Sequence, residues 1–474
     1  MGSKQSVLQE KGYTVMSEQD NELMVKNNDG DQFVIKKLNA NQNEASDFLQ
    51  KLNHPHIVHH KEIIKDGDCL YLVMELCEGG DVSQKIKDKK KETEILDWTV
   101  KICMALKHLH DQQILHKNLQ PKFAEKRTAD IIPKILNGIY EALPTNFSED
   151  LRQLVKDTLQ IDPANRPSIN EILMRPFIIK HLHEMSTKTV NKLNVCKKDE
   201  EETNESEDSQ EAPIESEVSL KVLEELADGL ERVHFNTTVG SLAGGVVGLA
   251  GGITSIVGLI LTPFTLGASL IVTGVGIGVA VAGGVASGVS NITKMVNQRS
   301  DRQKVKLLIT NIQEKITSTS YCIQNIQIAV ETQRLLSESN ESWLDAKSGE
   351  NTLMRAGARL GRGLGGVAEL VRLVQVTSAG RIAAQTARVV RVAEVATGVL
   401  TGLFVAVDIF FIALDSREIH NLRRDSASTN RNEQELRSEI MKFVKKIRET
   451  KDELKLILDE LNGVLQSLKP QIPD

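Results

Sequence analysis

The pattern of apolar and polar residues changes several times along the 474-residue chain. Residues 1–185 mix short apolar runs with polar turns, as a globular module does. Residues 186–217 are predicted to form an acidic disordered linker, because ten acidic side chains against two lysines fall between residues 197 and 217. Residues 218–474 are rich in helix-forming residues. The pattern therefore predicts a mainly α chain, in which a C-terminal helical bundle with a hydrophobic hairpin follows an α+β module.

The strongest physical signal is residues 235–293, a run of 59 residues without a charged side chain. Pro263 divides it into two apolar halves, each long enough for a helix of about 35–40 Å, whereas a hydrocarbon core is about 30 Å thick. We expect a hydrophobic helical hairpin with Pro263 at its tip. Small residues at four-residue spacing allow two such helices to approach closely in lipid. These are Gly240, Gly244, Gly248 and Gly252 in the first half, and Gly274, Gly278, Gly284 and Gly288 in the second.

Two interpretations of this hairpin remain open. It can be buried inside a soluble helical bundle, or it can contact a membrane in at least one state. Glycine costs about 1 kcal/mol at a water-exposed helix position, so the fourteen glycines of the run argue against a permanently solvated helix. A hairpin that is buried in one state and inserted in another satisfies both observations.

Two amphipathic segments accompany the hairpin, each with an apolar heptad repeat. The first contains Ile309, Ile312, Ile316, Ile323, Ile326 and Val330; the second contains Ile440, Phe443, Ile447, Leu454, Ile457, Leu461, Val464 and Leu468. Either segment can pack within the chain's own bundle, or it can bind a helical protein partner or a second copy of the chain.

A basic, glycine-rich stretch covers residues 351–391, where seven arginines face one acid, Glu369. The arginines are Arg355, Arg359, Arg362, Arg372, Arg381, Arg388 and Arg391. Interleaved with Leu and Val, they are expected to contact anionic lipid headgroups, although a solvated helical face is the alternative.

A third apolar run, residues 395–414, is interrupted only by Asp408. If Asp408 is buried, its pKa should be raised, and protonation at mildly acidic pH would ease membrane insertion. The alternative places Asp408 on the polar face of a bundle helix.

The overall composition narrows the functional classes. The net charge is −6 and the basic stretch has no aromatic side chain for base stacking, so nucleic acid is not an expected partner. Five scattered cysteines without a CxxC pair argue against a zinc site or a disulfide scaffold and suit a reducing compartment. We expect no metal and no cofactor. Gly2 with Ser6 fits the N-myristoylation pattern, a short motif that also occurs by chance.

The segment LADGLERVHFNTTVGSLAGGVVGLAGGITSIVGLILTPFTLGASLIVTGVGIG, together with ATGVLTGLFVAVDIFFIALDSREIHN, resembles the apolipoprotein L family. The resemblance covers residues 218–474. It implies a helical lipid-binding protein with a colicin-like hairpin and roles in lipid transport, lipoprotein association, membrane remodelling or pH-gated ion conduction. With no secretory signal visible, we expect a cytoplasmic protein on intracellular membranes; the family resemblance offers an extracellular, lipoprotein-associated location as the alternative.

Residues 33–185 contain segments that resemble NIMA-related (Nek) protein kinases. FVIK at 33–36 is similar to the third-strand motif that carries the phosphate-pairing lysine, here Lys36, and Glu44 is the candidate partner of that lysine. LYLVMELCEGGDV resembles the fifth strand and hinge, ALKHLHDQQILHKNLQPKF the approach to the catalytic loop, and LRQLVKDTLQIDPANRPSINEILMRPFI the last helices of the C-lobe.

The catalytic parts of a kinase are missing from this sequence. No glycine lies between residues 13 and 29, where the phosphate-cradling loop belongs. The catalytic aspartate position is Asn118, the loop lysine position is Gln120, and the metal-binding asparagine position is Phe123. The DFG motif and the activation segment are absent, and Arg166 has lost its usual glutamate partner. Because phosphoryl transfer needs these parts together, we expect an internally deleted pseudokinase that binds no ATP and is not an enzyme.

Two functions from different classes remain. In the first, the chain is a lipid-binding, membrane-associating protein with a relic kinase-like module. In the second, it is a pseudokinase scaffold for signalling that its C-terminal helices bring to membranes.

Overall fold

The computed structural model describes residues 7–19, 22–28, 30–38, 54–67, 69–77, 91–114, 143–194, 219–239, 257, 260, 288–344, 379–421 and 429–472. The chain divides into two compact units, Met1–Ile172 and Leu173–Asp474. The fold is mainly α with a small N-terminal sheet, which confirms the predicted fold class. The hairpin residues 240–256 and 261–287 lie outside the described residues.

The first unit contains a five-stranded antiparallel sheet in the order β1-β2-β3-β5-β4. Its strands are β1 (Thr14–Gln19), β2 (Glu22–Lys26), β3 (Gln32–Leu38), β4 (His60–Asp66) and β5 (Cys69–Glu75). Apolar side chains from one face form the core, including Val25, Ile35, Ile64 and Val73. The predicted third and fifth kinase strands are therefore paired directly, with Phe33 opposite Glu75 and Leu38 opposite Leu70.

The helices of the first unit are α4 (Glu92–Asp111), α6 (Glu149–Thr158) and α7 (Ile169–Leu173, whose last residue falls in the second unit), with the short 3-10 helix η2 (Pro163–Asn165). Ser148 caps α6, because its Oγ accepts a hydrogen bond from the Leu151 N–H at 3.2 Å. The same serine donates its backbone N–H to Glu92 in α4 at 2.8 Å. The N-termini of α4 and α6 are therefore joined, although α4 ends at Asp111 and α6 starts at Glu149.

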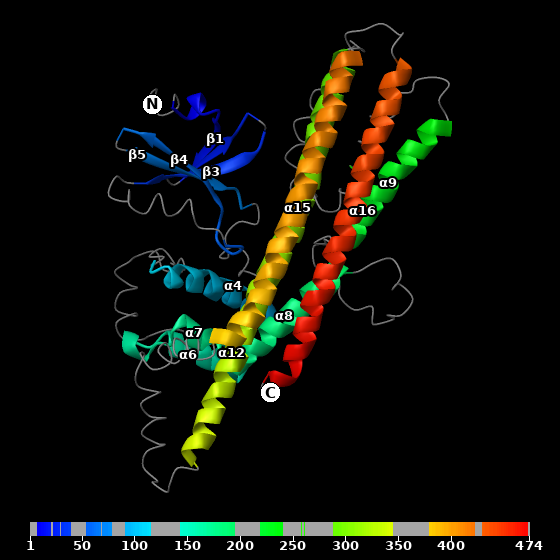
Figure 1. Cartoon of the computed structure of the whole chain (residues 1–474). Helices are drawn as coiled ribbons and strands as arrows, with labels where there is room; N and C mark the ends of the chain where they lie inside the picture. The colour runs from blue at the N-terminus through cyan, green and yellow to red at the C-terminus, as the bar shows by residue number, and fades with distance from the viewer. Residues whose placement is uncertain are drawn as a thin grey trace. The chain divides into compact units, whose positions relative to one another are not determined.

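The second unit is a bundle of long helices, with α8 (Pro176–Asn194), α9 (Leu220–Val239), α12 (Gly288–Leu344), α15 (Ala379–Asn421), α16 (Thr429–Leu468) and the 3-10 helix η3 (Lys469–Gln471). Helix α12 packs on α15 and α8, and α16 packs on α15, α9 and α8. Figure 1 shows α12, α15 and α16 running alongside one another. Their apolar faces form one elongated core.

Both predicted heptad repeats lie in this core. Ile309, Ile316 and Ile323 of α12 are buried, as are Ile440, Leu454 and Leu461 of α16. Near the end of α16 the repeat drifts, because Val464 is only half-buried and Leu465 is fully buried instead. A helix of 3.6 residues per turn rotates by about 20° per heptad relative to a strict repeat, which accounts for the shift.

The boundary between the modules differs from the expected one. The sequence places it at residue 185, followed by a disordered linker, whereas the two units meet at Ile172 and Leu173. Helix α8 continues to Asn194, so the first residues expected in the linker are helical. Its side chains Ile178, Leu182 and Leu193 are buried, and the His183 ring nitrogen Nε2 lies 2.9 Å from the backbone oxygen of Leu465 in α16. Helix α8 therefore belongs to the helical bundle.

Candidate functional site

The candidate phosphate-pairing lysine, Lys36, lies in the middle of β3. Its Nζ is 3.6 Å from Oε1 of Glu22 in the neighbouring strand β2, and both side chains are about half exposed, at 48% and 50%. Strands β1 and β2 form a tight hairpin in which Gln19 pairs with Glu22. The lysine is therefore paired with a carboxylate of this hairpin. Its expected partner Glu44 and the positions Asn118, Gln120 and Phe123 lie outside the described residues, as does Gly2.

Arg166, the arginine expected to lack its kinase glutamate partner, contacts a nearby loop. Its Nε donates to the backbone oxygen of Gln160 at 2.7 Å, and its Nη2 donates to that of Ile161 at 3.1 Å. Each of these carbonyls lies just after α6. The side chain thus closes the turn between α6 and η2, a structural use that the kinase resemblance does not predict.

Helix α15 is the one helix among the described residues that is long and apolar enough to cross a membrane, over Thr386–Leu414. One side of it packs in the bundle, where Leu403, Val407 and Phe410 are buried. The Phe410 ring stacks on Phe443 of α16, with ring centroids 4.4 Å apart. Since core helices of soluble proteins have the same length and hydropathy, these two properties alone do not assign a membrane span.

Asp408 interrupts the apolar sequence of α15 and is held by two cations of α12. Its Oδ1 lies 2.8 Å from Arg302 Nη2 and 2.6 Å from Lys306 Nζ. The Asp408 side chain is 36% exposed. Burial raises the pKa of Asp408, but the hydrogen bonds and charges of Lys306 and Arg302 outweigh it, and the net effect lowers that pKa.

The raised pKa expected for a buried Asp408 is therefore not found: the side chain is partly exposed, its pKa is lowered, and it lies at a contact between α15 and α12. Arg302 and Lys306 were not identified from the sequence. The signal that could have found them is their i,i+4 spacing in α12, which puts two cations on one helix face.

The α15 arginines that are described lie near its N-terminal end. Arg388 Nε donates to Oε1 of Glu460 in α16 at 2.6 Å, and Arg391 is exposed. Both line an open cavity of about 540 Å³ whose other lining residues are Ala387, Val392, Val395, Ile457 and Glu460. Arg381 also lies in α15, but its side chain is outside the described set. The remaining arginines of the predicted basic face, Arg355, Arg359, Arg362 and Arg372, lie outside the described residues.

The hairpin residues are mostly outside the described part of the chain as well. These are Gly240, Gly244, Gly248, Gly252, Pro263, Gly274, Gly278 and Gly284, whereas Gly288 is the first residue of α12. The predicted hairpin therefore starts after α9 and ends at α12, two helices that are anchored in the bundle.

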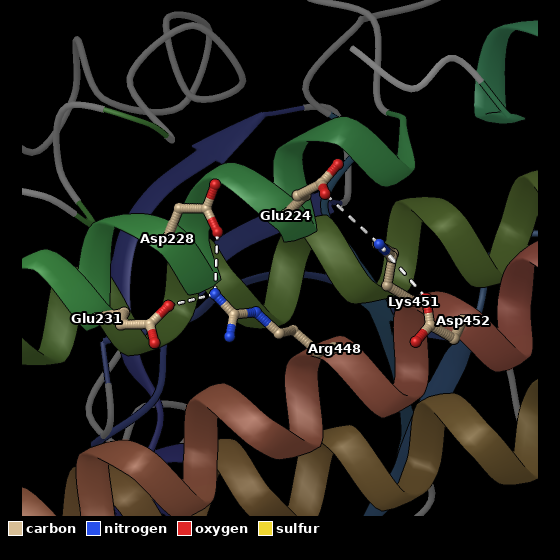
Figure 2. Close-up of polar contacts among 6 residues, drawn as sticks. All are labelled: Glu224, Asp228, Glu231, Arg448, Lys451 and Asp452. Carbon is tan, nitrogen blue, oxygen red and sulfur yellow. Dashed lines mark hydrogen bonds and ion pairs between the residues drawn. The ribbon is translucent and has the colours of Figure 1, made fainter. Parts of the chain in front are cut away.

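Helix α9, which leads into the uncharged run, is held to α16 by a cluster of ion pairs (Figure 2). Nη2 of Arg448 contacts Glu231 and lies 3.1 Å from Oδ1 of Asp228. One turn further along α16, Lys451 Nζ lies 3.6 Å from Oε1 of Glu224. The three acids recur at helical spacing on α9, so a single face of that helix meets the two cations. The hydrogen bond to Glu231 is the largest of the effects that raise the pKa of Arg448.

Reversing one charge of this cluster should weaken the α9–α16 contact. Arg448→Glu puts a carboxylate opposite Asp228 and Glu231, and we expect it to lower the free energy of unfolding of the helical unit by about 1–2 kcal/mol at low salt. High salt should reduce the loss, because the Arg448 side chain is 42% exposed and the charges are screened. Urea denaturation of the full chain, followed by far-ultraviolet circular dichroism, measures this change.

The matched control is Lys445→Glu, also on α16, because the Lys445 side chain is 79% exposed and its Nζ lies 3.7 Å from Oε1 of Glu449 on the same helix. Adding Glu231→Arg to Arg448→Glu should recover part of the lost stability. An Arg448→Glu variant as stable as the Lys445→Glu control would contradict a stabilising role for the cluster.

Comparisons with known proteins agree with the division of the chain into a kinase-like unit and a helical unit. The Apolipoprotein L family model matches residues 180–451, and the protein kinase domain model matches residues 20–123. An alignment of 239 positions, which covers 33% of this chain, shows 26% identity to mouse (Mus musculus) serine/threonine-protein kinase Nek1 and covers 20% of that protein. Over 79 residues the chain is 40% identical to mouse serine/threonine-protein kinase Nek3, covering 16% of each protein.

The helical part has its own relative. An alignment of 244 positions, which covers 48% of this chain, shows 28% identity to human (Homo sapiens) Apolipoprotein L3 and covers 56% of that protein. The chain thus spans about half of this relative and about a fifth of Nek1. Since the Apolipoprotein L model matches more than half of the chain, from α8 to α16, the chain belongs to the Apolipoprotein L family and carries a kinase-like module at its N-terminal end.

Proposed function

We propose that this chain is a lipid-binding, membrane-associating protein whose helical unit carries the activity. The observation that carries the proposal is the apolar surface of that unit. Helix α15 is apolar enough to cross a membrane and leaves Val405, Ile409 and Ile412 exposed, and the uncharged run of 59 residues begins near the end of α9 and ends near the start of α12. Membership of the Apolipoprotein L family supports the same function. The partner is an anionic phospholipid surface, because the arginines of residues 351–391 lead into α15.

Vesicle flotation of the full chain tests this proposal. We expect the protein to float with vesicles that contain phosphatidylserine and to float less with phosphatidylcholine alone, since the arginines add electrostatic attraction to apolar burial. The assay is run at pH 7 and pH 5. A chain that stays at the bottom of the gradient with both lipids at both pH values would refute the proposal.

We further propose that the kinase-like module transfers no phosphate. The support comes from Lys36, whose Nζ is paired with Glu22, and from the absence of glycine in the β1–β2 hairpin sequence. At the positions for the catalytic base and the metal ligand the sequence has Asn118 and Phe123. An amide cannot accept the substrate proton as a carboxylate does.

A measurement of nucleotide binding distinguishes an inactive kinase-like module from a working kinase. We expect ATP with Mg²⁺ to change the melting temperature of the full chain by less than about 1 °C, because a ligand stabilises only a protein that binds it. Trp98 in α4 reports on this unit by its fluorescence. A clear stabilisation by ATP that disappears in Lys36→Ala would overturn the proposal, since it would show a working phosphate site.

The location we propose is the cytoplasmic surface of intracellular membranes. Among the described residues, Cys69, Cys77 and Cys103 form no disulfide. Unpaired cysteines suit a reducing compartment.

A further inference from the structure

One face of α15 presents a line of exposed aliphatic side chains, here named the α15 strip. It consists of Val395, Val405, Ile409 and Ile412, which are 51%, 54%, 57% and 53% exposed. Gly398 and Thr401 are exposed between them. Successive members are three or four residues apart once these two are included, so they lie on one side of the helix. Single exposed apolar residues are ordinary, but a continuous line of them marks an interaction surface.

The strip is distinct from the core face of the same helix. Leu400, Leu403, Val407 and Phe410 point into the bundle and are buried. From Val395 to Ile412 the strip extends about 26 Å at 1.5 Å per residue. Its exposed members carry no charge over this length, so the strip is a flat apolar band rather than a closed pocket.

The charged groups around the strip favour an anionic partner. They come from the strip's own helix and from the two helices that pack on it, α12 and α16. Arg388 is paired with Glu460, and Arg302 and Lys306 are paired with Asp408. Lys446 of α16 approaches Gly402 of α15, and Arg391 lies one helical turn before Val395, on the same side of the helix as the strip. The basic sequence that precedes α15 adds four more arginines before residue 379.

At its N-terminal end the strip begins at the cavity of about 540 Å³. Val392, Val395 and Ile457 give the cavity an apolar lining. Glu460 is paired with Arg388, and Arg391 has no ion-pair partner among the residues that the structure describes. Arg391 therefore offers a guanidinium beside an apolar band, which is the arrangement that suits a phosphate attached to acyl chains.

We propose that the α15 strip docks the helical unit on the surface of an anionic phospholipid membrane. Helix α15 lies parallel to that surface, with Val405, Ile409 and Ile412 among the acyl chains and Arg391 at the phosphates. This inference rests on the proposed lipid-binding function and names its surface. It requires no opening of the bundle, because the strip is exposed while the opposite face of α15 stays packed.

The test is flotation of the full chain with vesicles of phosphatidylserine and phosphatidylcholine, using the triple variant Val405→Gln, Ile409→Gln and Ile412→Gln. Glutamine is a better helix former than valine or isoleucine, so the exposed substitutions leave the helix intact. The matched control is Leu456→Gln on α16, because Leu456 is 72% exposed and its neighbours along the chain include Lys455 and Asp459. Circular dichroism and melting temperature confirm that each variant is folded.

We expect the triple variant to bind vesicles about tenfold more weakly than the unaltered chain, and the control to bind equally well. Arg391→Glu should weaken binding about fivefold with phosphatidylserine and have little effect with phosphatidylcholine alone. Equal binding by the triple variant and the unaltered chain would overturn the assignment of the strip while leaving lipid binding itself intact. Failure of the unaltered chain to bind would refute the proposed function instead.

Two other occupants of the strip give different results. If residues 240–287 of the same chain cover it, the triple variant should release them and bind vesicles more tightly. If a second copy covers it, the triple variant should change the molar mass measured by light scattering without lipid. Either result overturns the proposal.

Discussion

A fragment that begins at residue 218 should fail to unfold cooperatively, whereas a fragment that begins at Leu173 should show a single sharp transition. The difference between them is α8, which packs on α12 and α16. Its side chains Ile178, Ile179, Leu182 and Leu193 are completely buried, and Val190 is 1% exposed. Burial of each such side chain contributes about 1.5–3 kcal/mol. Their sum is comparable with the whole stability of a typical domain, about 5–15 kcal/mol.

Urea denaturation of the two fragments, followed by circular dichroism at 222 nm, measures this difference. Within the longer fragment, Leu182→Ala should cost about 2–5 kcal/mol, as expected for a cavity in a packed core. Lys180→Ala is the matched control, since Lys180 is exposed on the same helix. Equal stability of the two fragments would show that α8 is not part of the bundle.

Acidification from pH 7.5 to pH 5 should destabilise the kinase-like unit by about 3–4 kcal/mol. Burial is the main cause that lowers the pKa of His54 to about 3 and that of His56 to about 4. His54 Nδ1 also accepts the backbone N–H of His56 at 3.1 Å, a hydrogen bond that needs the unprotonated nitrogen. The ring centroid of His108 in α4 lies 5.0 Å from that of His54.

The loss of stability at low pH follows from the number of protons that the histidines bind in the folded and unfolded chain. The folded pKa values lie below the unfolded value of 6.5, so between about pH 4 and 6.5 the unfolded chain binds more protons. Stability from these histidines is therefore complete above about pH 6.5 and is lost as the pH falls. Urea denaturation with Trp98 fluorescence, in a chain carrying Trp343→Phe, isolates this unit.

The helical unit should respond with the opposite sign. Asp301 in α12 is 3% exposed, and burial raises its pKa to about 6 despite the nearby Lys304. Its ionised form is therefore disfavoured in the fold, and stability should rise by about 1 kcal/mol as the pH falls from 7.5 to 5. Asp301→Asn should remove this rise. A helical unit that loses stability on acidification would contradict the role of Asp301, and a kinase-like unit that gains stability would contradict the role of the histidines.

Several elements of this fold follow from local pattern. Ile309, Ile316 and Ile323 repeat every seven residues and are buried, because one face of a long helix must be covered in a bundle. Lys36 lies in a strand as the surrounding β-branched and aromatic residues predict. These features depend on residues close together in the sequence.

The role of α8 could not be predicted in the same way. The resemblance to a kinase C-lobe assigned residues up to 178 to the first module, and the acidic residues from 199 onward favoured an early linker. The match to the Apolipoprotein L model begins at residue 180, inside α8. The sequence pattern that could have revealed this role is the apolar face of the helix. Leu182, Val190 and Leu193 continue that face past residue 178, which predicts a helix that extends beyond the kinase resemblance and packs on another core.

The ion pairs of Asp408 and Arg448 could not be predicted from the sequence either. Asp408 and Arg302 are 106 residues apart, and Arg448 and Asp228 are 220 apart. Charged residues on a helix face indicate possible pairs only within that helix. Which helices become neighbours depends on the packing of the whole bundle, and that packing reversed the expected direction of the pKa of Asp408.

The central claim is that the helical unit, and not the kinase-like module, carries the lipid-binding function. The most direct test is flotation of the fragment 173–474 beside the full chain, with vesicles of phosphatidylserine and phosphatidylcholine in low and high salt. Both proteins should float to the same extent, and high salt should reduce but not abolish flotation, because apolar burial is insensitive to screening. A folded fragment that stays unbound while the full chain floats would contradict the claim.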